Sequence, residues 1–379
     1  MDNQTILDHF TGRKEEILNS IHTVVEIESP SYDVLANLAV VDWFETQARR
    51  ISEEFEIERI FAEGYGEHFI LRAFPFDEKP VLLLGHIDTV HPVGTKNINP
   101  TRITDGKFYG CGIFDMKANC VLMLEILRAF TELSVKPARP LTILLSCDEE
   151  VGSFTGREVV EREAEKSAFC LVLEPSANGK VKTGRKGTGM FRMKTHGIPS
   201  HAGLEPEKGA SAILEISRQI VRLHATGDLQ KGTTVNVCTI SGGTATNVIP
   251  SEAECSIDVR FTSMAEAARI EKKIRSLESF DKKVSIEILG AINRPPLERT
   301  ENVIELYEKA RKIAAEFDYI LGETEVGGAS DGNFVAALGI PVLDGLGIAG
   351  NGAHTLEEFI FVEDIPKRAA ILANLILEN

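Results

Sequence analysis

Histidine and acidic side chains follow two apolar segments of this chain. His86 and Asp88 close one apolar run, and Glu149 and Glu150 come just after another, at residues 141–147. Short, near-continuous runs of Leu and β-branched residues are typical of buried strands. Open α/β sheets bind their ligands just beyond the carboxyl ends of such strands. We therefore expect an imidazole and several carboxylates at one edge of one sheet, a combination that suits zinc or another divalent first-row metal.

Three further residues could join such a site, although each also has an ordinary structural interpretation. Asp115 lies in a Gly-flanked loop just before a helix, where it could simply cap that helix. Glu174 precedes Pro175, which requires an extended backbone at the glutamate. His354 lies in a glycine-rich loop, and the paired glutamates could be a solvated acidic turn. Their joint placement at the ends of elements favours a metal site.

Apolar periodicity predicts the elements that must position these side chains. The first segments read as amphipathic helices, the second of them over residues 37–54. The next segments alternate between strand and helix, with strands at 68–74, 81–86, 141–147 and 169–174 and a helix at 118–131. This alternation predicts an α/β fold with a mostly parallel sheet covered by helices.

The pattern then changes to that of a second, smaller domain. The expected elements are strands at 190–196, 233–240, 253–261 and 284–289 and helices at 208–223 and 264–277. Their order, β-α-β-β-α-β, is that of a ferredoxin-like α+β sandwich. The adjacent prolines 295 and 296 mark the exit, because they resist both helix and central strand. We expect a ferredoxin-like domain of residues 186–294, inserted into a catalytic domain of residues 1–185 and 295–379.

The composition indicates which classes of binding partner and which cellular compartment to expect. The 379 residues include 41 Lys and Arg and 57 Asp and Glu, a net charge of −16, which argues against nucleic acid or an anionic membrane as a partner. No apolar stretch approaches the length of a membrane span, and the first residues lack the features of a signal peptide. The six cysteines contain no CxxC pair and read as small buried residues in a reducing compartment. These features predict a soluble, cytoplasmic protein.

Four motifs resemble those of a known enzyme family in order and spacing. They are Leu84-Gly-His-Ile-Asp-Thr-Val, Gly110-x-Gly-x-x-Asp-x-Lys, Asp148-Glu-Glu-x-Gly-Ser and Ser200-His-Ala-Gly. With these motifs the chain resembles the co-catalytic zinc carboxypeptidases and deacylases. That family includes glutamate carboxypeptidase, acetylornithine deacetylase, succinyl-diaminopimelate desuccinylase, aminoacylase and tripeptide aminopeptidase. The resemblance covers essentially the whole chain and is greatest to glutamate carboxypeptidase.

The resemblance implies a set of metal ligands. Asp115 would bridge two zinc ions, for which Co²⁺ or Mn²⁺ could substitute because divalent affinities overlap. His86 and Glu174 would complete the coordination of one ion, and Glu150 and His354 that of the other.

Two more carboxylates are implied to act beside the metals. Asp88 would hold the imidazole of His86, and Glu149 would take a proton from water and return it to the leaving amine. The family also often has a non-proline cis peptide after the bridging aspartate, so the bond between Asp115 and Met116 is expected to be cis.

The resemblance also implies groups in the inserted domain that act on the substrate. His201 would reach across a dimer interface to stabilise the oxyanion, and Asn247 would be a second such donor. By itself His201 would read as a surface or capping histidine. If both residues act on a partner's substrate, the protein is a homodimer formed through the inserted domain.

Further residues resemble groups that bind a substrate carboxylate. Arg260 and Arg294 suit this task through bidentate geometry, although either could be a surface ion pair. Gly328 and Ser330 lie in a segment that resembles a loop near the substrate's backbone carboxylate, although it also reads as a glycine-rich turn.

The expected function is that of a dinuclear zinc hydrolase that cleaves an amide bond to release an amino acid. Its substrate would be a small peptide or an N-acyl amino acid, processed by carboxypeptidase or deacylase activity. Family members with Glu at the position of Glu174 tend to be carboxypeptidases or deacylases, and those with Asp tend to be aminopeptidases or dipeptidases. A di- or tripeptide aminopeptidase and a non-catalytic metal- or peptide-binding protein are the alternatives.

Overall fold

The computed structural model describes residues 2–379 and divides the chain into two compact units. The larger unit consists of Met1–Gly184, Arg299–Glu325 and Ser330–Asn379. The smaller unit consists of Arg185–Glu298 and Val326–Ala329.

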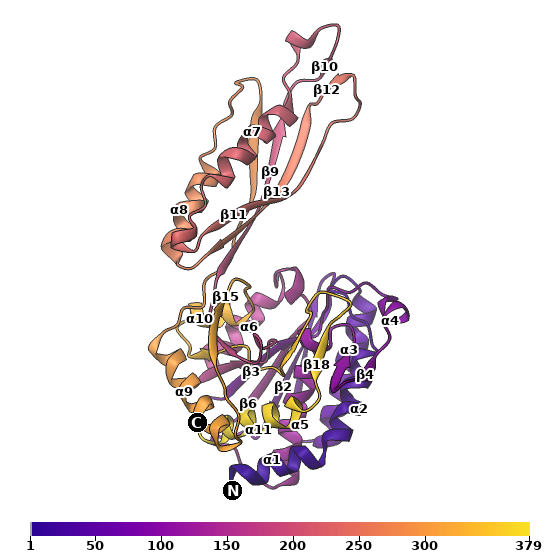
Figure 1. Cartoon of the computed structure of the whole chain (residues 1–379), viewed down its shortest axis with the longest axis vertical. Coiled ribbons are helices and arrows are strands. Elements are labelled where there is room, and N and C mark those ends of the chain that lie inside the picture. Colours follow the sequence, from indigo (N-terminus) through magenta and orange to yellow (C-terminus); the bar gives the residue numbers. More distant parts are fainter. Residues whose placement is uncertain (1) are drawn as a thin grey trace. The chain divides into compact units, whose positions relative to one another are not determined.

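The larger unit is built on a mixed six-stranded sheet (Figure 1). In spatial order its strands are β1 (Glu56–Ala62), β2 (Gly66–Ala73), β6 (Leu141–Ser146), β3 (Val81–His86), β7 (Phe169–Val172) and β16 (Val342–Leu343). The pairs β6–β3, β3–β7 and β7–β16 are parallel, and the pairs that involve β1 and β2 are antiparallel. Every residue of β3 and β6 is buried, so their apolar runs coincide with the observed strands.

Helices pack around this sheet. They are α1 (Asn3–Gly12), α2 (Lys14–Val25), α3 (Val34–Ile51), α4 (Thr95–Ile98), α5 (Ala118–Glu132), α6 (Gly156–Lys166), α9 (Glu301–Glu316), α10 (Gly332–Ala337) and α11 (Asp364–Leu377). Helix α5 is buried on nearly all sides, because it packs on β3 and is itself covered by α2, α3 and α11.

Short elements complete the larger unit. A second sheet has the order β17 (Gly350–Asn351), β18 (Phe359–Phe361), β5 (Lys107–Tyr109) and β4 (Arg102–Thr104). Two single turns, η1 (Ile113–Lys117) and η2 (Glu149–Val151), follow β5 and β6. A further pair joins β8 (Val181–Arg185) to β15 (Glu323–Val326).

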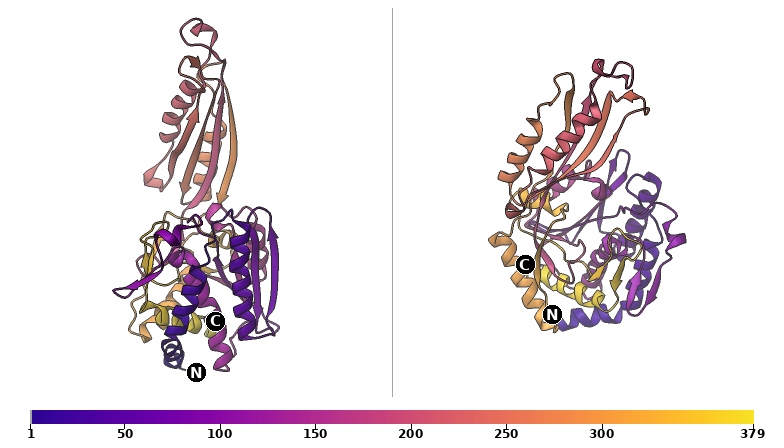
Figure 2. Two further views of the ribbon diagram at one scale, coloured as in Figure 1. Left: turned by 90° about the vertical axis from the view of Figure 1, so that its right-hand side faces the viewer. Right: turned by 45° about the horizontal axis from the view of Figure 1, so that its top comes forward.

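The smaller unit is an antiparallel sheet with two helices on one face (Figures 1 and 2). In chain order its main elements are β9 (Gly187–His196), α7 (Ala212–His224), β11 (Thr234–Gly242), β13 (Glu252–Phe261), α8 (Met264–Arg275) and β14 (Ser285–Arg294). The spatial order β11-β13-β9-β14 is that of a ferredoxin-like sandwich. Apolar residues of β13 alternate with half-exposed ones, as expected for a strand with one buried face. Short elements of this unit are β10 (Ser200–His201), β12 (Val248–Ile249), η3 (Pro206–Lys208) and η4 (Leu229–Lys231).

Two elements of the smaller unit differ from the boundaries expected from sequence. The helix expected from residue 208 begins at Ala212, because the side chain of Ser211 accepts the N–H of Leu214 and caps it. The strand expected to stop at residue 289 continues through Gly290 to Arg294. Gly290 has a φ of +89°, and a Cβ there would lie 2.1 Å from the carbonyl oxygen of Met190, so this position requires glycine.

A short segment beyond the expected insertion also belongs to the smaller unit. The backbone N–H of Lys186 donates to the carbonyl of Val326 at 3.0 Å, and Arg185 Nη1 donates to the carbonyl of Ala329 at 3.1 Å. These bonds attach Val326–Ala329 to the smaller unit, although the sequence pattern did not indicate this segment.

All six cysteines are free thiols, as the sequence predicted, and Cys238 is exposed while the other five are buried. Among residues 2–379, no helix has both the length and the apolarity needed to cross a bilayer.

Substitution of Leu83 tests the role of the buried strand β3. Leu83 is fully buried in the main core, so we expect Leu83→Ala to lower the free energy of unfolding by about 2–5 kcal/mol. Leu35→Ala is the matched control, because Leu35 is 78% exposed on α3, and it should change stability by no more than about 0.5 kcal/mol. Urea unfolding of the metal-free protein measures both, and equal effects would contradict the assigned core.

Candidate metal centre

The end of β3 presents a histidine that an aspartate orients. His86 is the last residue of the strand, and both His86 and Asp88 are buried. His86 Nδ1 lies 3.0 Å from the carbonyl oxygen of Asp88 and 3.4 Å from its Oδ1. Because Nδ1 faces these acceptors, it carries the ring proton in the neutral tautomer, and Nε2 is the nitrogen that can bind a metal.

Asp88 also connects this strand end to the turn that bears the paired glutamates. Its carboxylate accepts the backbone N–H groups of Glu149 and Glu150 at 3.2 and 3.1 Å. It accepts a third bond from Ser31 Oγ at 2.7 Å. Ser31 could not be predicted from the sequence, because no motif surrounds it and its contact spans 57 residues of chain.

Two further buried aspartates, Asp148 and Asp331, accept hydrogen bonds from residues that flank the same turn. Asp148 accepts the backbone N–H of Thr155 at 2.7 Å and its hydroxyl at 2.9 Å. Asp331 accepts hydroxyl bonds from Ser146 and Ser153. Three carboxylates that are not among the proposed ligands thus bond to this turn and to the residues that flank it.

Asp115 faces two imidazoles with its two oxygens. It lies in η1, where its backbone is not helical, with φ −117° and ψ 91°. Its Oδ1 lies 3.2 Å from His86 Nε2, and its Oδ2 lies 3.5 Å from His354 Nε2. One carboxylate shared in this way has the arrangement that a bridging ligand needs. The peptide bond between Asp115 and Met116 is cis, as the resemblance led us to expect.

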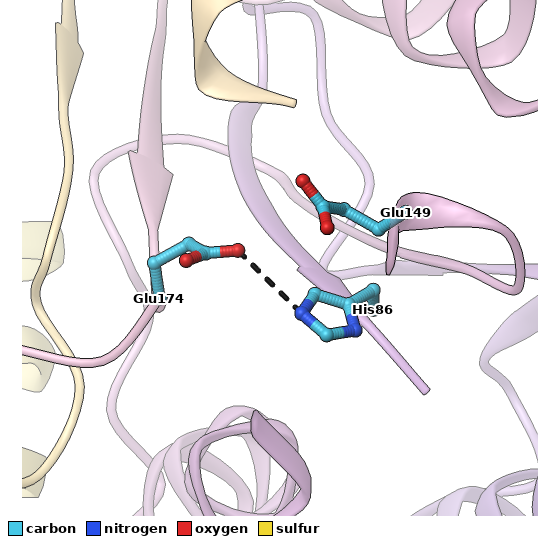
Figure 3. Close-up of side chains that lie close together, drawn as sticks. All are labelled: His86, Glu149 and Glu174. Carbon is cyan, nitrogen blue, oxygen red and sulfur yellow. Dashed lines mark ion pairs between the residues drawn. The ribbon is translucent and has the colours of Figure 1, made fainter. Parts of the chain in front are cut away.

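Each imidazole also has a carboxylate of its own. His86 Nε2 lies 3.5 Å from Glu174 Oε1, an ion pair that Figure 3 shows. His354 Nε2 lies 3.1 Å from Glu150 Oε2. The five expected ligands thus form a continuous series in the order Glu174, His86, Asp115, His354 and Glu150.

Glu149 lies beside this series. One oxygen or nitrogen atom from each of His86, Glu149 and Glu174 lies within 4.8 Å of the others (Figure 3). The same holds for His86, Asp115 and Glu150. Glu150 is therefore close to His86 as well as to His354. The cluster is compact, because His86 and Glu150 lie near each other although they belong to different proposed ion sites.

The surroundings of the cluster raise the pKa values of its two histidines and of Glu150 and lower the pKa of Asp115. Burial would lower the pKa of His86, but hydrogen bonds to Asp115 and Asp88 raise it well above its usual value. Hydrogen bonds to Asp115 and Glu150 raise the pKa of His354 to about 10. Burial would raise the pKa of Asp115, but hydrogen bonds from His354 and His86 hold it well below its usual range. Burial raises the pKa of Glu150 to about 6. The carboxylates thus favour positive charge between them.

The donor set fits divalent metal ions. It combines imidazole nitrogens with carboxylate oxygens, which suit zinc and similar first-row ions. Glu150 Oε1 is buried and has no hydrogen-bond partner among residues 2–379. A buried carboxylate oxygen without a partner is costly, and a bound cation would satisfy it.

His201 and Asn247 lie together in the smaller unit. His201 pairs with Val248 between β10 and β12, and the N–H of Ala202 donates to the carbonyl of Asn247 at 2.9 Å. His201 is exposed, and its Nδ1 accepts the N–H groups of Gly203 and Leu204 at 3.2 and 3.1 Å. Because Nδ1 accepts, Nε2 carries the proton in the neutral tautomer and can donate to a substrate oxygen.

The remaining expected substrate residues have partners within the chain. Arg260 makes a bidentate pair with Asp258, with Nη2 2.8 Å from Oδ2 and Nε 3.0 Å from Oδ1. Arg294 is buried in the smaller unit, and its Nη1 donates to Asn293 Oδ1 at 3.3 Å.

The expected loop at Gly328 and Ser330 is also engaged in internal contacts. The carbonyl of Gly328 accepts Arg185 Nη1 at 3.4 Å. Ser330 is fully buried in the larger unit, and its hydroxyl donates to Asp344 Oδ2 at 2.6 Å. This hydroxyl is therefore committed to a contact inside the protein.

Comparison with known proteins shows the family to which the chain belongs. The model of peptidase family M20/M25/M40 matches residues 82–378. Carboxypeptidase G2 of Pseudomonas sp. (strain RS-16) is 28% identical over 376 residues, which covers 97% of this chain and 90% of that protein. Succinyl-diaminopimelate desuccinylase of Acinetobacter baumannii (strain AYE) is 31% identical over 326 residues, which covers 80% of this chain and 84% of that protein.

Solved structures share the fold. Aminopeptidase PepT from Bacillus cereus ATCC 10987 has a TM-score of 0.76 and 21% identity, covering 96% of this chain and 98% of that chain. The M20 family metallo-carboxypeptidase Sso-CP2 from Sulfolobus solfataricus has a TM-score of 0.74 and 15% identity, and the match covers 95% of this chain and 98% of that chain. The relatives and the family match set aside the non-catalytic alternative. The chain belongs to peptidase family M20/M25/M40, a family of typically zinc-dependent metallopeptidases, and is a hydrolase of peptide or amide bonds.

Proposed function

We propose that this protein is a dinuclear zinc hydrolase that cleaves an amide bond to release an amino acid, as a carboxypeptidase or an N-acyl-amino-acid deacylase. The observation that carries the proposal is the position of Asp115, whose two oxygens face two imidazoles. His86 and Glu174 would hold one ion with Asp115, and His354 and Glu150 the other. Zinc, or Co²⁺ or Mn²⁺ in its place, would polarise the amide carbonyl and acidify water.

Glu149 is the proposed general base and acid. It lies beside His86 and Glu174, and its backbone is fixed by the N–H bond to Asp88 at 3.2 Å. A carboxylate at this position accepts a proton from the attacking water and then delivers it to the nitrogen of the leaving amine. Asp88 holds His86 with Nε2 toward the cluster, which keeps the ligand geometry constant during turnover.

The product is proposed to carry a free carboxylate on the amine side. Two relatives are named a carboxypeptidase and a desuccinylase, and the residue beside His86 is Glu174, both of which support this class of substrate. Arg294 and Arg260 are proposed to bind that carboxylate through their guanidinium groups. For Arg260 this requires an exchange of its present partner, Asp258, for the substrate.

A homodimer through the smaller unit is proposed to complete the active site. Strand β11 is an edge of its sheet, and apolar side chains are exposed on it and on the adjacent α7. Leu214 is 52%, Val221 73% and Ile240 55% exposed. An unprotected edge strand beside such a surface favours pairing with a second copy of the chain. His201 and Asn247 of one protomer would then donate to the substrate oxygen in the site of its partner.

Matched substrates test the proposed reaction. With zinc supplied, we expect hydrolysis of an N-acylated dipeptide and release of its C-terminal amino acid, because the reaction requires no free amine. Glu149→Gln should lower kcat by about 10²–10⁴-fold with both metal ions still bound, because it removes the proton carrier. Chromatography of the products measures both. Cleavage of only the free-amine form of the same dipeptide would indicate an aminopeptidase, and full turnover by E149Q would exclude Glu149 as the base.

Proton release tests the metal ligands. In the metal-free protein, the pKa of His354 is raised to about 10 and that of His86 is raised as well, so both imidazoles hold protons at neutral pH. Zinc must displace these protons, and apparent zinc affinity should therefore rise with pH from about 6 to 9. Calorimetry in buffers with different ionisation enthalpies counts the protons released. The His354→Ala variant should release fewer protons when it binds zinc. A zinc affinity that does not change with pH would contradict the assignment of His86 and His354 as ligands.

Mixed dimers test the action of His201 across the interface. His201→Ala alone should lower kcat by about 10²–10³-fold, because it removes an oxyanion donor. If His201 acts on the partner's site, a refolded mixture of H201A and E149Q should regain activity, because one site of each mixed dimer has both groups. A mixture of E150Q and E149Q is the control and should remain inactive, because both residues serve the same chain's site. If H201A is impaired and the first mixture does not recover, His201 does not act across the interface. An unchanged kcat in H201A would place His201 outside catalysis.

A further inference from the structure

Glu358 is a fully buried glutamate whose carboxylate is surrounded by N–H donors. Its Oε1 accepts the backbone N–H groups of Phe114 and Asp115, each at 2.8 Å. Its Oε2 accepts the backbone N–H of Gly112 at 2.9 Å and lies 2.9 Å from His91 Nε2. Three backbone N–H groups and one imidazole nitrogen thus fix the position of this buried carboxylate.

The small sheet of the larger unit delivers Glu358 to this position. Strand β18 lies between β17 and β5, with Phe359 opposite both Asn351 and Tyr109. Glu358 directly precedes β18 and Gly110 directly follows β5, and the carbonyl of Glu358 accepts the N–H of Gly110 at 3.3 Å. His354 lies in the turn between β17 and β18, four residues before Glu358.

The contacts of Glu358 join three segments that carry proposed metal-site residues. Gly112 and Asp115 belong to the segment of the bridging carboxylate, and His91 follows the segment of His86 and Asp88. Glu358 itself follows His354 along the chain.

The backbone at Asp115 needs such a partner. Asp115 and Met116 have non-helical dihedral angles within η1, so regular helical bonding does not hold this stretch. Gly112 has a φ of +70°, and a Cβ there would lie 2.4 Å from Thr89 Cγ2, so the loop also packs closely against the segment after β3. The carboxylate of Glu358 takes the N–H groups that this irregular turn leaves unpaired.

We propose that Glu358 is a positioning residue that sets the place of the Asp115 carboxylate between His86 and His354, and thereby the affinity for the bridged metal ions. The inference rests on the proposed function, since it assumes that Asp115 is a metal ligand. In this proposal Glu358 acts through Asp115 and is not itself a ligand of the ions. It holds the backbone N–H of Asp115 itself, so a shift of Glu358 moves the bridging oxygens relative to both imidazoles.

Glu358→Gln is the variant that tests this role. Both carboxylate oxygens accept N–H donors, and the glutamine amide must place its NH₂ group against one of these two pairs. Glu215→Gln is the matched control. Glu215 is also buried and accepts backbone N–H groups, those of Phe280 and Asp281, but it belongs to the smaller unit, which contributes none of the proposed ligands.

The readout is metal binding, measured together with the stability of the metal-free protein. We expect E358Q to lose about 10- to 100-fold in affinity for at least one zinc ion in competition with a chelating dye, the range found when a partner of a metal ligand is removed. Its Co²⁺ absorption spectrum should also differ from that of the wild type. E215Q should keep the wild-type affinity and spectrum even where its metal-free protein melts at a lower temperature.

The outcomes separate the inference from the function on which it rests. Wild-type protein that binds no zinc would overturn the proposed metal site. Wild-type binding of two ions, with unchanged affinity and spectrum in E358Q, would overturn the role of Glu358 alone. If E358Q does not fold, Glu358→Asp decides by the same titration, because it keeps the charge but withdraws the oxygens by one methylene. Unchanged zinc affinity in E358D would then refute the proposal.

Discussion

The metal centre depends on compensation of charge around one partly buried carboxylate, that of Asp115. Asp115 places each of its oxygens against a different imidazole, and each imidazole is paired with a further glutamate. Without positive charge between them, acidic groups this close would repel one another in surroundings of low polarity. In the metal-free protein the same interactions raise the pKa values of His86 and His354 and lower the pKa of Asp115.

The arrangement of strands explains how distant parts of the chain reach this centre. The parallel neighbours β3, β6 and β7 end at the same edge of the sheet, and each is followed within a few residues by a member of the cluster. Asp115 and His354 come instead from loops of the small β17-β18-β5 sheet. The ends of strands in the six-stranded sheet thus position His86, Glu150 and Glu174. Loops of the small sheet position the two remaining proposed ligands.

The sequence predicted the buried elements and missed the irregular ones. Strand β3 was expected at its observed bounds because an unbroken apolar run marks a strand buried on both faces. The edge strand β1 was not expected, since it is half exposed and rich in charged residues. The strands β17 and β18 have only two and three residues and show no periodicity.

The same distinction applies to individual side chains. His86, Asp115 and His354 could be chosen because they lie in motifs, and the structure brings them together. Ser31 and Glu358 act through contacts to distant backbone or side-chain groups, which no local pattern records. The pairing of Arg260 with Asp258 and the burial of Ser330 depend on strand register and packing, which sequence spacing does not determine.

The smaller unit has a hydrophobic core of its own, formed by residues such as Phe191, Ile216, Val259 and Ile270. All five proposed ligands come from the other unit, whose core is separate. Changes in the insertion can therefore alter the groups that are proposed to contact the substrate while the set of proposed metal ligands stays unchanged. Separate cores give each unit its own stability, so a substitution in one hydrophobic core need not disturb the packing of the other.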